Sequence, residues 1–131
     1  MDWLEAQKKL GKRRFKKLGN NTYLIVSRHD VSNQPIFGVK LHKTIVVEIL
    51  PSGEFALNSG GFTTRTTKNR IETYSPAYIV SRKGTWHLRT PNHPKDIFKF
   101  VEFFDGVLID ENGSVLNGDP SAIKPREWWE G

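Results

Sequence analysis

Apolar and polar residues alternate with a period of two over several short segments of the chain, a pattern typical of β-strands. The most apolar of these, 44–50, is predicted as a central strand, and 22–27 is rich in the β-branched and aromatic residues that favour strands. Gly, Pro and Asn residues between the segments supply turns. The predicted strands are 22–27, 36–42, 44–50, 55–57, 62–67, 78–82 and 85–89, with hairpin turns at 51–54 and 83–84.

The first ten residues have helical spacing instead. Asp2 stands in the position of an N-cap, with Glu5 three residues later as in a capping box. Trp3, Ala6 and Leu10 fall on one face of this helix. A glycine follows, and glycine weakens a helix by about 1 kcal/mol relative to alanine. We therefore expect a short helix that frays into a basic arm ending at residue 18.

Three later segments complete the predicted elements. Apolar residues at i, i+3, i+4 and i+7 over 96–104 predict a helix, although the same run is compatible with a strand. Residues 68–74 are expected to form a helical turn. Residues 107–116 are expected to form a short hairpin around the Asn-Gly pair at 112–113.

These elements predict a strand-rich α+β fold. It consists of a small, mostly antiparallel sheet or partly open barrel of about five to seven strands, with a short N-terminal helix and a helix near 96–104. The expected organisation is a basic N-terminal helix or arm (1–18), a single β-rich domain (19–116) and a tail (117–131). Because the strand pattern begins only at Thr22, we expect the domain to stay folded without the arm.

Composition narrows the possible functions. A chain of 131 residues fits one domain that needs no disulfide or metal to fold. The absence of cysteine excludes disulfides, cysteine nucleophiles and thiolate metal sites. It also suits a reducing cytosol. No run of 18 apolar residues is present, so we expect no membrane span.

The formal net charge of +6 is unevenly distributed along the chain. Residues 1–18 carry a net charge of +5, residues 19–95 carry +6 and residues 96–131 carry −5. Two basic regions therefore precede an acidic one. This asymmetry indicates either a polyanionic partner for the basic part or an internal contact between the two ends of the chain.

The basic arm is the strongest candidate for a binding function. Lys or Arg occupies seven of the ten positions from Lys8 to Lys17, and binding to phosphates requires such a density of cations. Two other interpretations stay open. The arm could be a solvated tail, or it could dock on the acidic third of the chain at Asp105, Asp110 and Glu111.

Four segments carry a resemblance to a known group of proteins. They are Asn-Thr-Tyr-Leu at 21–24, Leu-His-Lys-Thr at 41–44, the hairpin glycine Gly53, and Gly-Gly-Phe-Thr-Thr-Arg-Thr-Thr-Lys-Asn-Arg-Ile at 60–71. In this order and spacing they resemble a group of small bacteriophage-encoded proteins, over residues 20–88. The resemblance implies a phage or prophage origin and action in the cytoplasm of a bacterial host. It brings no established activity.

The block 60–71 also suggests a phosphate contact. Its two glycines permit close approach of backbone amides, and hydroxyls, amides and Arg commonly contact phosphate. The alternative is structural, with the glycines forming a bend and the threonines pairing across strands. The predicted nucleic-acid-binding residues are Lys8, Lys9, Lys12, Arg13, Arg14, Lys16, Lys17, Arg65, Lys68 and Arg70.

Histidine and carboxylate spacing gives no catalytic or metal site. The four histidines form neither an i, i+4 pair on a helix nor a His-x-His pair on a strand. His42 is two positions before Thr44 and is expected on the same strand face, as a hydrogen-bonded structural histidine. We therefore expect no enzyme activity, no cofactor and no metal.

The aromatic residues leave two readings open. Tyr23, Phe37, Phe55, Phe62, Tyr78 and Trp86 are spread over the predicted strands and are expected to lie mostly in the core, although an outward-facing set would stack on bases. Trp128 and Trp129 in the tail could anchor a host or virion protein. The favoured function is therefore binding of DNA or RNA by a phage protein, and the alternative is a protein-interaction factor.

Overall fold

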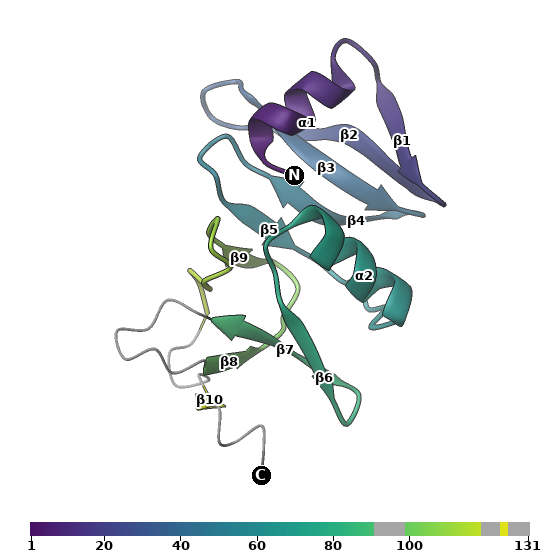
Figure 1. Ribbon diagram of the computed structural model, residues 1–131. Coiled ribbons are helices and arrows are strands. Elements are labelled where there is room, and N and C mark those ends of the chain that lie inside the picture. Colours follow the sequence, from purple (N-terminus) through teal and green to yellow (C-terminus); the bar gives the residue numbers. More distant parts are fainter. Residues whose placement is uncertain (91–98, 119–123, 126–131) are drawn as a thin grey trace.

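A computed structural model describes residues 1–90, 99–118 and 124–125, and it has the strand-rich α+β fold that the sequence predicts (Figure 1). Within these residues the elements, in chain order, are α1 (Trp3–Leu10), β1 (Phe15–Gly19), β2 (Thr22–His29), β3 (Pro35–Leu41), β4 (Thr44–Ile49), β5 (Phe55–Leu57), α2 (Arg65–Tyr74), β6 (Ile79–Arg82), β7 (Thr85–Thr90), β8 (Lys99–Glu102), β9 (Val107–Ile109) and β10 (Lys124–Pro125).

The strands form two antiparallel sheets rather than one. The first has the order β1-β2-β3-β4-β5-β9, and the second has the order β10-β8-β7-β6. The predicted strands 22–27, 36–42, 44–50 and 55–57 are confirmed in the first sheet. The predicted hairpin of 78–82 and 85–89 is also confirmed, but it belongs to the second sheet. The prediction that all of them share one sheet or barrel is therefore wrong.

Both helices pack against the same face of the first sheet (Figure 1). Ala6 and Leu10 of α1 and Ile71 of α2 are buried in one core cluster with Leu24 and Val39 of the sheet. Trp3 adds a hydrogen bond from its indole Nε1 to the carbonyl oxygen of residue 35, at 2.8 Å, which fixes the start of α1 beside β3. Among the residues that the structure describes, no helix packs on the opposite face of strands β1 to β3.

The basic arm expected up to residue 18 is not a separate arm. The predicted helix is confirmed, with Asp2 accepting a hydrogen bond from the backbone N–H of Glu5 at 2.8 Å. The segment that follows forms β1, which pairs with β2 in the register Phe15↔Ile25 and Lys17↔Tyr23. Residues 1–18 thus supply an edge strand and part of the core, so we expect their removal to destabilise the domain rather than leave it intact.

The threonine-rich segment predicted as a strand at 62–67 is helical in its second half. Thr64 caps α2, because its Oγ1 accepts a hydrogen bond from the N–H of Thr67 at 3.2 Å. The hydroxyl also lies 3.0 Å from the Thr67 hydroxyl. Threonine favours strands by propensity, but a capping position and the burial of Ile71 against the sheet outweigh that preference. The predicted turn at 68–74 is the continuation of this helix.

The helix predicted at 96–104 is also wrong over the part that the structure describes. Residues 99–102 form β8, paired with β7 in the register Leu88↔Val101. The apolar residues fit the period of a helix as well as that of a strand. Without β8, one edge of β7 would lack a partner, and pairing with this edge favours the strand. Residues 96–98 and the two tail tryptophans, Trp128 and Trp129, lie outside the described residues.

Two predicted turns are confirmed by their backbone geometry. Lys83 and Gly84 both have positive φ, 51° and 79°, as a two-residue turn between paired strands requires. In the later turn Gly113 has φ 86°, and the Asp110 carboxylate accepts hydrogen bonds from the N–H groups of Asn112 and Ser114, each at 2.9 Å. There the pairing is limited to a single bridge between Ile109 and Val115. Neither described helix has the length and apolar character needed to cross a membrane.

The docking of α1 gives a stability prediction. Replacing the buried Leu10 by Ala should lower the free energy of unfolding by about 2–4 kcal/mol, because it leaves a cavity between α1 and the sheet. Leu4→Ala is the matched control on the same helix, since Leu4 is 62% exposed and its loss should change stability by about 0.5 kcal/mol or less. Urea unfolding followed by circular dichroism measures both, and equal losses would contradict the docking of α1.

Candidate nucleic-acid interface

The uncovered face of β1, β2 and β3 carries aromatic, apolar and basic side chains. Leu24 and Val39 point to the helices, so their strand neighbours Tyr23, Ile25 and Lys40 point the other way. Phe15 lies opposite Ile25 and Lys17 opposite Tyr23 in the antiparallel register, which puts both on this same face. We call this set the open face: Phe15, Lys17, Tyr23, Ile25, Lys40 and His42.

The aromatic residues of the open face form a surface suited to stacking. The rings of Phe15 and Tyr23 have centroids 5.7 Å apart and an interplanar angle of 82°. Phe15 is 60% exposed, although it is a large apolar residue. A shallow hollow of about 370 Å³ lies between Phe15, Tyr23, Ile25, Lys40 and His42. An exposed ring beside a hollow floored by an aliphatic side chain can hold a planar aromatic ligand.

A glycine shapes the sheet next to this hollow. A Cβ on Gly38 would lie 3.0 Å from the Ile45 side chain and 3.1 Å from the Ser27 Cβ. The Ile25 Cγ1 would lie 3.6 Å from the same Cβ, so the side chains of Ile25 and Ile45 border the space that Gly38 leaves free. The open face is therefore flatter than a row of larger side chains would make it.

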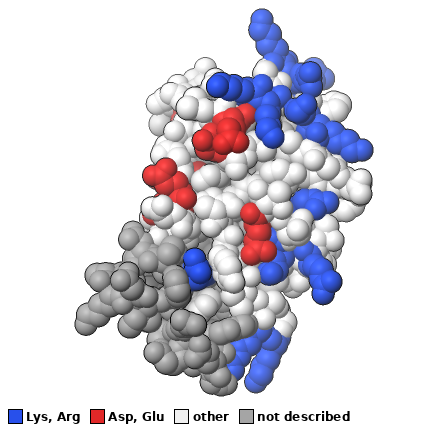
Figure 2. Space-filling view, in the orientation of Figure 1, with Lys and Arg blue, Asp and Glu red and all other residues white. Residues whose placement is uncertain are grey.

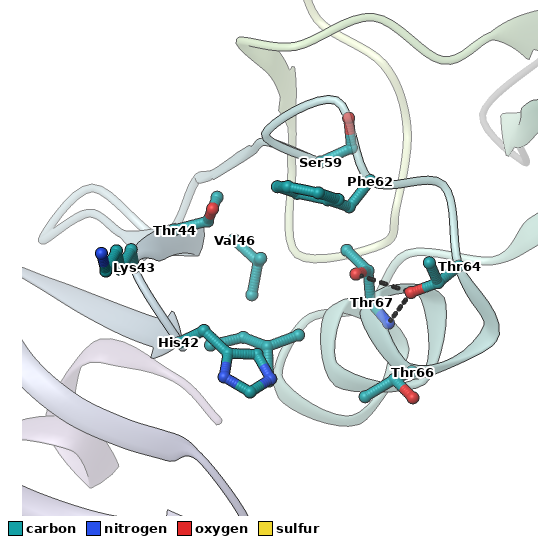
Figure 3. A pocket seen from close by; sticks show the side chains of 10 residues that line it. His42, Lys43, Thr44, Val46, Ser59, Phe62, Thr64, Thr66 and Thr67 are labelled. Atoms are coloured by element: carbon teal, nitrogen blue, oxygen red, sulfur yellow. Dashed lines mark hydrogen bonds between the residues drawn. The ribbon is translucent and has the colours of Figure 1, made fainter.

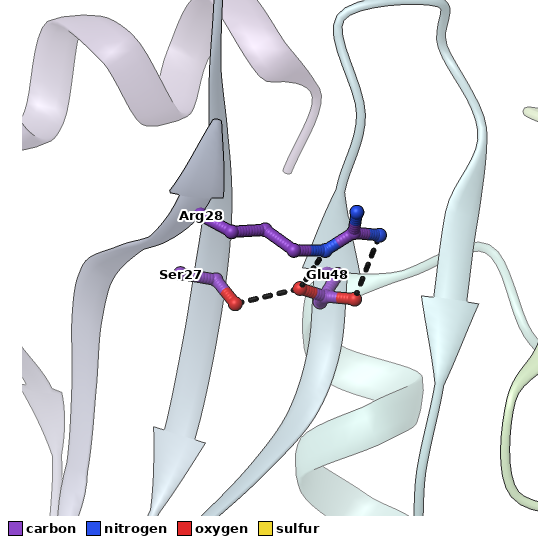
Figure 4. Close-up of polar contacts among 3 residues, drawn as sticks. All are labelled: Ser27, Arg28 and Glu48. Atoms are coloured by element: carbon purple, nitrogen blue, oxygen red, sulfur yellow. Dashed lines mark hydrogen bonds and ion pairs between the residues drawn. The ribbon is translucent and has the colours of Figure 1, made fainter. Parts of the chain in front are cut away.

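The charge on the strands of this sheet is mainly positive. Strands β1 to β4 contain four Lys or Arg residues and a single acidic residue, Glu48. Glu48 is paired with Arg28, whose Nε lies 3.1 Å from Oε2, and it also accepts a hydrogen bond of 2.6 Å from the Ser27 hydroxyl (Figure 4). Glu48 lies in the same cross-strand row as Gly38 and Ile25, and its pairing with Arg28 offsets this carboxylate, so Lys17 and Lys40 supply the net charge near the aromatic residues.

The structure gathers the N-terminal cations at one end of the molecule. Lys8 and Lys9 lie exposed in the last turn of α1, and Lys12, Arg13 and Arg14 lie exposed in the turn before β1. Figure 2 shows Lys and Arg side chains gathered over the end that carries α1 and this turn. Lys17 belongs to the open face, whereas Lys16 points to the other side of β1.

The contact between the basic segment and Asp105, Asp110 and Glu111, which the sequence left open, is not formed among the described residues. Asp105, Asp110 and Glu111 flank β9, and β1 and β9 are the opposite edges of the first sheet. Five strand spacings separate these edges, a distance of roughly 24 Å. Asp105 is instead bonded to Ser59, whose N–H and hydroxyl donate to its Oδ1 at 2.7 and 2.8 Å.

The three predicted cations of α2 differ from one another in their surroundings. Arg65 is exposed at the start of the helix. Lys68 pairs with Glu72 at 3.5 Å on the same helix. Arg70 donates from Nε to the buried Thr22 hydroxyl at 2.9 Å, and so ties α2 to the β1–β2 turn. Of the three, Arg65 is therefore the cation best placed to contact a partner, because it forms no ion pair or side-chain hydrogen bond with the described residues.

A second, larger cavity lies where the β3–β4 turn meets the start of α2 (Figure 3). Its volume is about 520 Å³, and we call it the α2 pocket. It is lined by Leu41, His42, Lys43, Thr44, Val46, Ser59, Phe62, Thr64, Thr66 and Thr67. Two of the four segments that carry the resemblance noted in the sequence, 41–44 and 60–71, thus meet around one cavity.

The pocket depends on a close approach between two backbone segments. An ideal Cβ on Gly60 would lie 2.7 Å from both Oγ1 and Cγ2 of Thr44. Gly60 also has φ 63°, a conformation that glycine adopts readily. Asn58 and Ser59 hold the loop, since their side-chain oxygens accept hydrogen bonds from the N–H groups of Gly60 and Gly61 at 2.8 and 3.1 Å. The bend that the sequence left as the structural alternative is therefore present.

His42 is not the strand residue that its spacing predicted. It lies exposed in the β3–β4 turn with φ 53°, and its N–H donates to the Asn21 carbonyl oxygen at 2.8 Å. Histidine tolerates this left-handed conformation better than most residues. The side chain lines both the hollow of the open face and the α2 pocket, and it joins the two. Among the residues that the structure describes, no three His, Asp or Glu side chains form a group able to hold a metal.

The distribution of aromatic residues differs from the expectation in three places. Phe37, Phe55 and Trp86 are buried, as predicted. Phe62 and Tyr78 are 63% and 52% exposed, and Tyr23 lies half-buried on the open face. Sequence reasoning also missed Lys40 as a candidate residue of this face. The alternation along 36–42 held the signal, but only the register across β1, β2 and β3 shows which residues share the face.

Comparisons with known proteins give one family. The model of the Kyanoviridae Gp96 protein family, a bacteriophage family, matches residues 5–110. The match includes most of α1, all of α2, the open face and the α2 pocket. Neither the curated proteins nor the solved structures gave a match.

The close approach at Gly60 predicts a difference between neighbouring glycines. Gly60→Ala and Gly61→Ala both place alanine at positive φ, which costs about 1–2 kcal/mol. Gly60→Ala should lower the free energy of unfolding by about 1–3 kcal/mol more, because its Cβ collides with Thr44, whereas a Cβ on Gly61 meets nothing within 4 Å. Adding Thr44→Ala should recover part of the loss for Gly60→Ala only. Equal unfolding curves for the two glycine variants would contradict this contact.

Proposed function

Because this chain belongs to the Kyanoviridae Gp96 protein family and is therefore phage-encoded, we propose that it is a non-enzymatic protein that binds single-stranded nucleic acid in the cytoplasm of the bacterial host. The observation that supports this most directly is the open face. It combines an aromatic pair, in which Phe15 is exposed and Tyr23 half-buried, with Lys17 and Lys40 on strands that contain one paired carboxylate and with His42 in the adjoining turn.

Each part of the open face matches a part of a nucleotide chain. Unpaired bases expose flat apolar faces, which stack on aromatic side chains such as Phe15 and Tyr23. The phosphates between successive bases carry the negative charge that Lys17, Lys40 and the exposed cations at 12–14 attract. Contacts of this kind are tolerant of sequence because every base has an aromatic face.

A single strand fits this surface better than a duplex. In a duplex the base faces are stacked on one another, so Phe15 and Tyr23 would gain nothing from a helix lying across the sheet. The cations at 12–14 can contact the phosphates of either form. Binding through the whole open face therefore favours unpaired strands, of DNA or of RNA, while the cations alone provide weaker binding to duplex.

The cationic contribution predicts a salt dependence. With about five phosphate contacts, the logarithm of the affinity for a single-stranded oligonucleotide should fall with log salt at a slope near −3.5. Replacing Lys12, Arg13 and Arg14 together by Gln should flatten the slope by about 2, because three contacts are lost. Lys83→Gln, in the β6–β7 turn of the second sheet, is a control that should leave the slope unchanged. Titrations followed by fluorescence anisotropy between 50 and 300 mM salt measure the slope for each variant.

The opposite result would favour the alternative function. If affinity for nucleic acid is absent, or if the slope is the same for the triple variant and the original protein, the basic end does not contact phosphate. Capture of a host or virion protein that survives nuclease treatment and moderate salt would then support a protein-interaction factor, for which Trp128 and Trp129 are the candidate anchors.

The aromatic contribution predicts a second difference. Phe15→Ala should weaken binding to a single strand by about 1–3 kcal/mol, because one stacked base loses its partner. Phe15 is 60% exposed, so the fold should persist. Tyr78→Ala is the matched control, an exposed aromatic residue next to the second sheet. The same anisotropy titration applies, and a loss no greater than that of the control would remove the open face from the proposed interface.

A further inference from the structure

The α2 pocket is larger and more enclosed than the hollow of the open face, and stacking on the open face does not use it. Its volume of about 520 Å³ falls within the roughly 300–1,000 Å³ typical of small-molecule sites. It opens beside the open face, since His42 lines both cavities. A strand that lies across the open face therefore passes the mouth of this pocket.

The walls of the pocket combine apolar surface with hydroxyl groups. Leu41 and Val46 contribute aliphatic surface, and Phe62 contributes a ring that is 63% exposed. Figure 3 shows Phe62 and His42 on different sides of the cavity, with Val46 between them. Two flat side chains beside an aliphatic floor suit a planar ligand with apolar faces.

Two hydroxyls are available for the polar edge of such a ligand. Thr64 and Thr67 bond to each other, and Ser59 bonds to Asp105. The side-chain hydroxyls of Thr44 and Thr66, in contrast, have no hydrogen-bond partner among the residues that the structure describes, and both residues line the pocket. A hydroxyl both donates and accepts, so it can pair with either kind of group on the edge of a base.

We propose that the α2 pocket accepts one nucleobase, turned out of the strand that is bound on the open face. This inference rests on the proposed function for the source of the base. The base lies between Phe62 and His42, and Thr44 and Thr66 contact its edge. Lys43, exposed at the mouth, contacts the adjoining phosphate. Extrusion of the base costs little, because an unpaired base loses only its stacking on neighbours.

A pair of variants that differ in position by three residues tests the pocket. Thr66→Phe, in the first turn of α2, fills it, and Thr63→Phe adds the same bulk on an exposed residue just before the helix that does not line it. Both leave every cation and the whole open face intact. Thr66→Phe should weaken binding of an eight-nucleotide single strand about tenfold, the loss expected for one base contact. Thr63→Phe should change it less than twofold, and Phe62→Ala should resemble Thr66→Phe.

Equal affinities for the two phenylalanine variants would overturn the inference, even if the protein binds the strand tightly, and the proposed function would then stand without the pocket. If no single strand binds, the proposed function fails. The pocket is then tested separately by NMR titration of the protein with adenosine monophosphate or uridine monophosphate. Amide shifts at Phe62 and Thr66 that disappear in Thr66→Phe would support a nucleobase site that takes a free nucleotide. Absence of such shifts would overturn the inference as well.

Discussion

The burial of one face of the first sheet beneath α1 and α2 is the constraint on which the other features depend. Ala6, Leu10 and Ile71 contact that face, and the buried strand residues opposite them include Leu24 and Val39. Fully burying an aliphatic side chain of this size contributes about 1.5–3 kcal/mol. Because a slip of one residue would expose this whole set, the register of the strands is fixed.

The same register determines the open face. Once Leu24 points to the helices, Tyr23 and Ile25 must point away, and pairing brings Phe15, Lys17 and Lys40 beside them. The residues with the greatest potential for binding are therefore neighbours of the most buried residues. A change in the core that shifted β1 against β2 would also dismantle the stacking surface, although it touches none of its side chains.

The α2 pocket depends on two contacts that tie separate segments together. Gly60 lets the loop after β5 approach Thr44 closely, and Arg70 bonds to the buried Thr22 and holds α2 over the β1–β2 turn. Arg70 was predicted to contact phosphate, but its hydrogen bonds to Thr22 and to Asn69 give it a structural role. Gly60 can adopt the backbone conformation that brings its loop to Thr44, and Arg70 is long enough to reach Thr22. Together the two contacts position the walls of the pocket.

Much of the first sheet was predictable because its strands are short, apolar and separated by clear turn residues. The capped helix at 3–10 was predictable as well. The segments at 62–67 and 99–102 were not, because their residues fit both periods and only the neighbouring elements decide between them. For Phe15 and the basic residues around it, composition indicated a basic arm, whereas the structure pairs this segment with β2 as a strand.

The features of the candidate site also divide into those that the sequence determines and those that depend on the tertiary structure. The density of cations from Lys8 to Lys17 and the mainly positive character of the first ninety-five residues are properties of the sequence by itself. The sequence also determined the strand-rich α+β class, through the period of its apolar residues. Only the tertiary structure decided that β1 and β9 lie at opposite edges, that Phe15 and Tyr23 share a face with Lys40, and that His42 joins two cavities. The physical reason is that charge and period are local, whereas register, sheet order and the meeting of two loops depend on contacts between residues far apart in the chain.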